Sequence, residues 1–135
     1  MDIDLSQKFL PPIWLKGIAL FGLIFGIVTL FSGGSVLFGS ESARISAGNY
    51  VPLVVWFNFT AGFFYIIAAI GVLLGKPWSY PLSVLIAVAT ATTAAIFAYY
   101  VSTGVGFEMR TVAALAVRTG FWSLMAFLIR RSLKG

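Results

Sequence analysis

The chain has few residues that could do chemistry, and Arg118, in the middle of an apolar run, stands out among them. Cysteine and histidine are absent, which removes thiolate and imidazole chemistry and the usual ligands of zinc, copper and iron. Only four residues are Asp or Glu. No nucleophile–base pair can be assembled from this inventory. We therefore expect no enzymatic activity, no metal site and no cofactor.

Arg118 stands between Val117 and Thr119, and an arginine near the centre of a bilayer costs at least about 2.5 kcal/mol. Its guanidinium has five N–H donors and no acceptor, so it must face hydrogen-bond acceptors. Glu108 precedes it by ten residues, which corresponds to roughly 15 Å along a helix. Direct pairing of these two side chains along one helix is therefore implausible, and Arg118 requires another partner.

Neutral polar residues occur at a similar depth in the other apolar stretches, and we predict that they gather around Arg118. The predicted polar cluster, which either binds a ligand or is structural, consists of Arg118, Asn58, Thr92, Tyr65, Tyr99 and Thr111. The predicted rim of this pocket consists of Glu41, Arg44, Glu108 and Arg110. A buried cation among neutral acceptors suits an anion, a lipid phosphate or a carbonyl such as a quinone oxygen.

Two other interpretations of the cluster remain open. Arg118 could hydrogen-bond to Asn58, Tyr65 or backbone carbonyls and only lock the helices together, as polar residues in membrane spans often do. Alternatively, a partner subunit could supply a carboxylate to Arg118.

The elements that must position these residues are four apolar stretches, each long enough to cross a bilayer, which needs about 20 helical residues. Only 10% of the residues are charged, against about 25% in a soluble domain. We predict an all-α fold, a four-helix transmembrane bundle that forms a single membrane domain over residues 1–135. The predicted spans are residues 13–38, 52–74, 79–101 and 111–129.

The distribution of Lys and Arg predicts the orientation of these spans. Six of these residues flank the side that carries both termini, namely Lys8, Lys16, Lys76, Arg130, Arg131 and Lys134, and two, Arg44 and Arg110, lie on the opposite side. The positive-inside rule then predicts cytoplasmic N- and C-termini and a multi-pass protein of the bacterial inner (plasma) membrane. Because topology explains the net charge of +5, we expect membrane lipid and not nucleic acid as a partner.

Small residues form stripes on every predicted span, and such stripes mark helix contacts in lipid. They comprise Gly22, Gly26, Thr29 and Gly33 in the first span; Asn58, Ala61, Gly62, Tyr65 and Ala69 in the second; Ala87, Ala91, Ala94, Ala95 and Ala98 in the third; and Ala116 and Gly120 in the fourth. We expect these stripes to face one another inside the bundle. The alternative is a homo-oligomer that forms through the Gly22–Gly26 or Gly71–Gly75 face.

Two segments carry a resemblance to known proteins. The sequence VPLVVWFNFTAGFFY at residues 51–65 resembles a pattern in small, uncharacterised bacterial four-span membrane proteins. The segment Glu108-Met109-Arg110-Thr111, together with Arg118-Thr119, is similar to the same group. The general layout also resembles the DoxX-like membrane proteins, some of which are subunits of redox systems. These resemblances imply a membrane location and no particular activity.

The sequence favours a non-catalytic four-span protein that acts as an accessory or assembly subunit of a larger membrane complex. The small size, the short connections and the missing catalytic residues support this prediction, which implies a protein partner that buries a small-residue face. The alternative is a binding or transport protein for an anionic, lipid or quinone-like ligand, held in an outer-leaflet pocket around Arg118.

Overall fold

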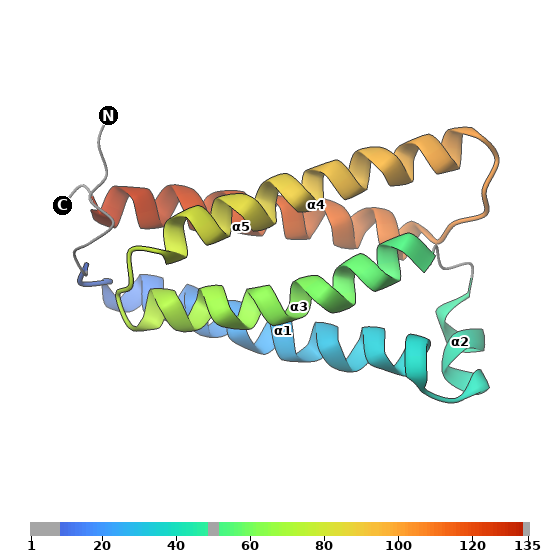
Figure 1. Cartoon of the computed structure of the whole chain (residues 1–135), viewed down its shortest axis with the longest axis horizontal. Helices are drawn as coiled ribbons and strands as arrows, with labels where there is room; N and C mark the ends of the chain where they lie inside the picture. The colour runs from blue at the N-terminus through green and yellow to red at the C-terminus, as the bar shows by residue number, and fades with distance from the viewer. Residues whose placement is uncertain (1–8, 49–51, 134–135) are drawn as a thin grey trace.

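The protein is described by a computed structural model that covers residues 9–48 and 52–133. Lys8 and Lys134, which belong to the predicted charge count, lie outside the described residues. The helices are α1 (Ile13–Phe38), α2 (Glu41–Ala47), α3 (Pro52–Leu73), α4 (Ser79–Ser102) and α5 (Met109–Leu133) (Figure 1). Four of them, α1, α3, α4 and α5, are long and apolar enough to cross a membrane. The predicted all-α, four-helix fold class is therefore confirmed.

The bounds of the long helices agree with the predicted spans to within one residue, except at the ends of α5. This helix runs from Met109 to Leu133, whereas the predicted span covered only residues 111–129. The apolar run ends before Arg130, but the helical hydrogen bonding does not, and Arg130 and Arg131 lie in the last turn. Cations are favourable there because the C-terminal end of a helix carries a partial negative charge.

Helix α2 is an element that the sequence analysis treated as a connection. Its Arg44 donates from Nε to the carbonyl oxygen of Val36 at 2.9 Å and from Nη2 to that of Leu37 at 3.4 Å. Both carbonyls belong to the last turn of α1, where the carbonyl groups have no partner within the helix. Arg44 therefore caps α1 and holds α2 against its end.

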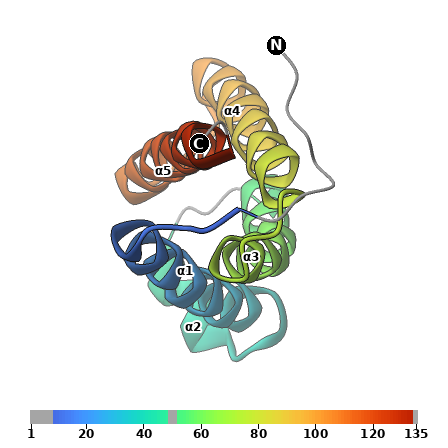
Figure 2. The ribbon, with the colours of Figure 1, turned by 90° about the vertical axis from the view of Figure 1, so that its left-hand side faces the viewer.

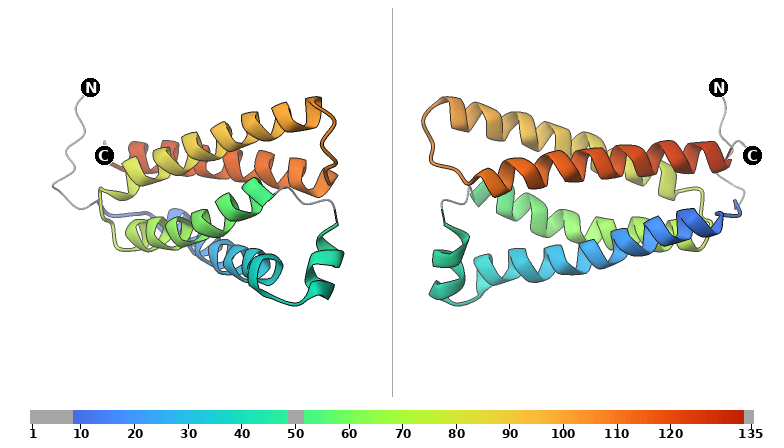
Figure 3. Two further views of the ribbon diagram at one scale, coloured as in Figure 1. Left: turned by 45° about the vertical axis from the view of Figure 1, so that its right-hand side comes forward. Right: turned by 180° about the vertical axis from the view of Figure 1, so that it is seen from behind.

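The four long helices form a ring in which α3 lies between α1 and α4, and α5 lies next to α4 and α1 (Figure 2). The closest pairs are α1 with α3 and α4 with α5, and α1 touches α5 much less. Helices α1 and α5 converge at the end that carries the chain termini and separate towards the end that carries α2 (Figure 3). We call these the termini end and the α2 end.

The contact between α1 and α3 is built on glycine. The stripe Gly22, Gly26, Thr29 and Gly33 is buried, as predicted. A Cβ on Gly26 would lie 3.1 Å from the carbonyl oxygen of Gly62, and a Cβ on Gly62 would lie 3.2 Å from that of Gly26. The two backbones approach this closely because neither residue has a side chain, as in other small-residue contacts of membrane helices.

The two glycine faces that were predicted as alternatives for forming a homo-oligomer are covered by other residues of the same chain. Gly22 faces Phe121 and Trp122, and Gly26 faces Tyr65 and Ile66. A Cβ on Gly71 would lie 2.8 Å from the ring of Trp78, and Gly75 adopts a positive φ of 68° in the turn between α3 and α4. Neither the Gly22–Gly26 nor the Gly71–Gly75 face is therefore open to a second copy.

The predicted role of the alanine ladder in α4 is wrong. Ala91, Ala95 and Ala98 are exposed, and the buried face of the helix consists of Ser79, Ser83, Ile86, Thr90, Thr93 and Phe97. Threonine is tolerated there because its hydroxyl donates to a carbonyl of its own helix, Thr90 to Ile86 at 2.7 Å and Thr93 to Ala89 at 3.0 Å. Ala116 and Gly120 of α5 are likewise exposed.

The close approach of α1 and α3 leads to a stability prediction. Gly26→Leu is expected to lower the free energy of unfolding by about 1–3 kcal/mol, because the added atoms would overlap backbone and side-chain atoms of α3. Gly17→Leu is the matched control, since a Cβ on Gly17 meets nothing within 4 Å. Equilibrium unfolding in mixed micelles measures both changes. Equal stabilities of the two variants would contradict the packing described here.

Candidate functional site

Arg118 lies against a layer of aromatic rings. Its guanidinium carbon is 4.8 Å from the centre of the Phe25 ring and 5.8 Å from that of the Tyr65 ring. Its Nη1 donates to the Tyr65 hydroxyl over a long 3.4 Å. Tyr65 is completely buried. The cation is therefore held by two ring faces and one hydrogen bond, which is the kind of contact that stabilises a desolvated guanidinium.

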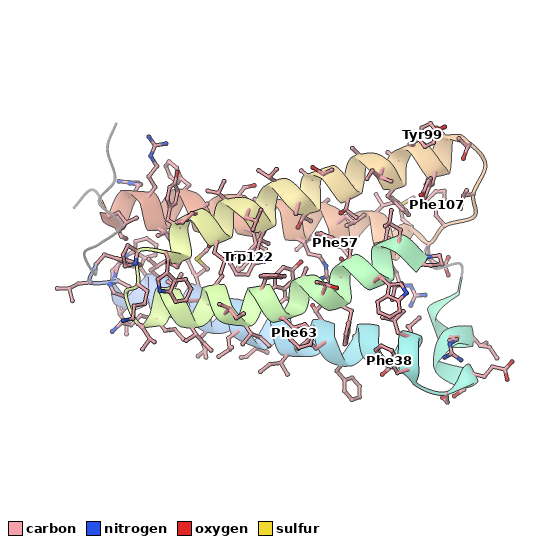
Figure 4. All side chains as sticks on the ribbon, viewed as in Figure 1. Phe38, Phe57, Phe63, Tyr99, Phe107 and Trp122 are labelled. Carbon is pink, nitrogen blue, oxygen red and sulfur yellow. The ribbon has the colours of Figure 1, made fainter. Side chains whose placement is uncertain are left out.

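The aromatic layer follows from the faces that α1, α3 and α5 bury. Leu115 and Trp122 of α5 are buried, and Arg118 is three and four residues from them, so it lies on the same inward face. The Phe25 and Tyr65 rings stack with centroids 5.9 Å apart and an interplanar angle of 6°. Tyr65 also stacks on Trp122 at 5.2 Å, and Trp122 lies between the helices (Figure 4).

A cavity of about 140 Å³ lies beside the guanidinium. Three helices line it: α1 through Thr29, Ser32, Gly33 and Val36, α3 through Val55 and Asn58, and α5 through Arg118. The four α1 residues follow the i, i+3, i+4, i+7 spacing of one helix face. We call this cavity the Arg118 pocket. The cavity lies on the α2 side of the aromatic layer, because α1 runs from Phe25 through these residues to its end at Phe38.

Three buried polar atoms without a hydrogen-bond partner belong to residues that line the Arg118 pocket. In the described part of the chain they are Nε of Arg118, Oδ1 of Asn58 and Oγ1 of Thr29. An unpaired buried polar group costs about 1–3 kcal/mol, and a charged one costs more. Native proteins pair nearly all such groups, so each exception needs an explanation. Three such exceptions therefore belong to residues that line one cavity.

No carboxylate in residues 9–48 and 52–133 forms an ion pair with Arg118. Glu108 instead lies 3.5 Å from Nη2 of Arg110, and Glu41 is exposed on α2. The pocket therefore carries a positive charge in a low-dielectric region, where the attraction for an anion is several times stronger than in water.

The structure brings together part of the predicted polar cluster. Arg118 contacts Tyr65 and lines the same cavity as Asn58. Thr92 and Tyr99 do not line it, because both are exposed on the outside of α4; Tyr99 points away from the bundle (Figure 4). Thr92 satisfies its hydroxyl at the carbonyl oxygen of Val88, 2.8 Å away. Thr111 is half-buried on α5 and does not line the cavity.

None of the predicted rim residues lines the Arg118 pocket. Arg44 caps α1, and its contact with Val36 places it beside the pocket wall. The Glu108 carboxylate lies against Gly48 at the end of α2, where a Cβ would collide with it. The pocket is lined instead by Thr29 and Ser32 of α1, whose polarity within an apolar stretch places them in the same half of the predicted spans as Asn58 and Arg118.

A second hollow lies between α4 and α5, lined almost entirely by small and apolar residues. It has a volume of about 780 Å³. Its small residues are Ala91, Ala94 and Ala98 of α4 and Ala116, Thr119 and Gly120 of α5. We call it the alanine groove. The small-residue stripes of these two helices therefore lie side by side and open outwards, whereas the sequence analysis placed them inside the bundle.

The unpaired Nε and the long hydrogen bond of Arg118 predict how this residue affects stability. Arg118→Gln is expected to leave the free energy of unfolding unchanged or to raise it, because the substitution removes a buried charge that lacks a counter-ion. Tyr65→Phe removes only the 3.4 Å hydrogen bond and should cost less than about 1 kcal/mol. Unfolding in mixed micelles measures both. A loss of about 2 kcal/mol or more in Arg118→Gln would instead show that Arg118 locks the bundle.

No protein-family model, curated protein or solved structure matches this chain. The resemblance to small bacterial four-span proteins and to the DoxX-like layout therefore stays a prediction. The function has to be inferred from the geometry of the Arg118 pocket and of the alanine groove.

Proposed function

We propose that this chain is a membrane-embedded binding protein that holds a small anionic group in the Arg118 pocket. The observation that carries the proposal is that Arg118, Asn58 and Thr29, each of which has a buried polar atom without a partner within the described residues, all line one cavity. The membrane location is supported by four helices that are long and apolar enough to cross a membrane.

The chemistry of the pocket suits an anion that accepts several hydrogen bonds. Arg118 offers guanidinium N–H groups, and the Thr29 hydroxyl can rotate to donate. The Asn58 amide exchanges its oxygen and nitrogen positions by a half-turn, so it can donate as well. Hydrogen bonds between a guanidinium and an anion are about twice as strong as neutral ones. An anion that accepts hydrogen bonds from these residues would therefore neutralise the buried charge.

The distribution of Lys and Arg supports an outer-leaflet position for the pocket. Under the positive-inside rule the termini end faces the cytoplasm, and the pocket lies towards the opposite, α2 end. An anionic group would then approach from the periplasmic side of a bacterial inner membrane.

Thermal unfolding in a mild detergent tests the proposal with chloride, acetate, dodecanoate and inorganic phosphate at constant ionic strength. At least one anion is expected to stabilise the wild type, by about 2.7 kcal/mol when its concentration is 100 times Kd. Arg118→Gln should lose this stabilisation. The control Arg110→Gln, whose side chain is 71% exposed, should keep it. The proposal is wrong if none of the four anions stabilises the wild type, or if Arg118→Gln responds equally.

The alanine groove favours a second candidate function, an accessory or assembly subunit of a larger membrane complex. Lipid tails are as apolar as the groove, so hydrophobicity alone does not draw a partner in, but small residues let another helix backbone approach closely. Gly120 is open to such an approach, since a Cβ there would meet nothing within 4 Å. The groove lies between α4 and α5, on residues that do not line the Arg118 pocket, so the two functions are independent.

A pair of alanine variants tests the second candidate. Ala98 lines the groove and Ala95 does not, although both are exposed on α4. Ala98→Leu is expected to abolish a complex that is retained in mild detergent and detected by native mass spectrometry, because the leucine fills the groove. Ala95→Leu should preserve it. A wild-type chain that is always monomeric and without a partner, or a complex that survives Ala98→Leu, would rule this candidate out.

A further inference from the structure

We infer that the anionic group is the carboxylate of a single-chain amphiphile, such as a fatty acid, which reaches the Arg118 pocket sideways from the bilayer between α1 and α5. This inference rests on the proposed function and names the ligand class of the same site. Four features of the described residues carry it: where the pocket opens, what closes its other end, the charge it must balance, and its depth.

The pocket opens on the lipid-facing side of α1. Ser32 lines the cavity and is also exposed, and α1 and α5 are separated in this half of the bundle (Figure 3). The exposed neighbours of the opening are apolar: Val28 is 53% exposed, Phe31 is 76% exposed and Val117 is 61% exposed. Side chains of this kind suit hydrocarbon chains and not an aqueous path.

Aromatic rings close the gap between α1 and α5 on the termini side of Arg118. The Phe21 and Phe121 rings lie 5.7 Å apart, and Phe121 approaches so closely that a Cβ on Gly22 would lie 3.2 Å from it. The opening is therefore confined to the α2 side of Arg118, so a ligand head group that enters there meets the guanidinium at the closed end.

The charge and shape of the pocket select a carboxylate among anions. Arg118 contributes one positive charge, and a carboxylate contributes one negative charge, whereas a phosphate monoester at neutral pH carries more than one. A phosphodiester has a chain on either side of its phosphorus, but a carboxylate is an end group that fits a cavity of about 140 Å³. Nη1 of Arg118 is engaged by Tyr65, and the other N–H groups of the guanidinium remain for a carboxylate oxygen.

The depth of Arg118 favours a ligand that carries its own apolar chain. Arg118 follows the first residue of α5, Met109, by nine positions, a rise of roughly 13 Å into a hydrocarbon layer about 30 Å thick. A free inorganic anion loses its hydration on reaching that depth, at a large cost in free energy. An amphiphile keeps its chain in lipid throughout, so only the carboxylate must be desolvated.

Native mass spectrometry of the full chain in nanodiscs of zwitterionic lipid, at about pH 8 so that carboxylates are ionised, tests the inference with three probes. Dodecanoate has both the charge and the chain, dodecanol has the chain alone, and acetate has the charge alone. Dodecanoate is expected to bind the wild type at least about tenfold more tightly than either of the others. Arg118→Gln should reduce dodecanoate binding to the level of dodecanol.

A second variant keeps the test valid if Arg118→Gln does not fold. Ser32→Phe places a ring at the exposed opening, leaves the guanidinium intact and should weaken dodecanoate binding about tenfold. The matched control is Thr92→Phe, which places the same ring on an exposed position of α4 away from the pocket. That control should bind dodecanoate as the wild type does.

The outcomes separate this inference from the proposed function. If acetate binds as tightly as dodecanoate and requires Arg118, the pocket binds anions from water, and only the inference is overturned. If dodecanol binds as tightly as dodecanoate, or if Ser32→Phe has no effect, the carboxylate or the lateral path is wrong. If neither dodecanoate nor acetate binds, and chloride and phosphate also fail to stabilise the wild type, the proposed function falls together with the inference.

Discussion

The glycine contact between α1 and α3 is the interaction on which the rest of the structure depends. Because Gly26 and Gly62 have no side chains, the two backbones lie close enough for Phe25 and Tyr65 to stack almost parallel. These rings form the surface on which the Arg118 guanidinium rests. A wider separation of α1 and α3 would part the rings and leave the cation without its support. The Arg118 pocket therefore depends on the packing of Gly26 against Gly62, which lies about one helical turn from the polar residues Thr29 and Asn58.

The bundle is tight on one side and open on the other, and this difference explains why a polar site can exist in so small a protein. Helix α1 packs closely on α3, and α4 on α5, whereas α1 and α5 have far fewer contacts, among them the one between the Phe21 and Phe121 rings. A uniformly packed bundle would have no room for unpaired polar groups. Proteins give up local stability at binding sites in this way, and unpaired groups that look like defects in the unbound structure become partners of a ligand.

Hydrophobicity predicted the fold well but could not predict which face of each helix is buried. The four spans follow from the length of the apolar runs, and the glycine stripe of α1 is buried as expected. In α4 the small-residue rule failed, because Thr90 and Thr93 hide their hydroxyl groups within the helix and pack like apolar residues. The same back-bonding lets Thr92 face lipid. Helix α2 was not predicted because it is held by the Arg44 side chain, which caps α1. That is a contact between two elements, and hydrophobicity along the chain does not reveal it.

The hydrogen bond between Arg118 and Tyr65 joins two helices that are made at different times during synthesis. The threonines of α4 satisfy their hydroxyl groups alone, so this helix can enter the bilayer without waiting for a neighbour. Helix α5 cannot, since its guanidinium finds its acceptor and ring faces only on α3 and α1. Both of these helices precede α5 in the chain. Synthesis from the N-terminus therefore makes the residues that contact the guanidinium before it makes Arg118 itself.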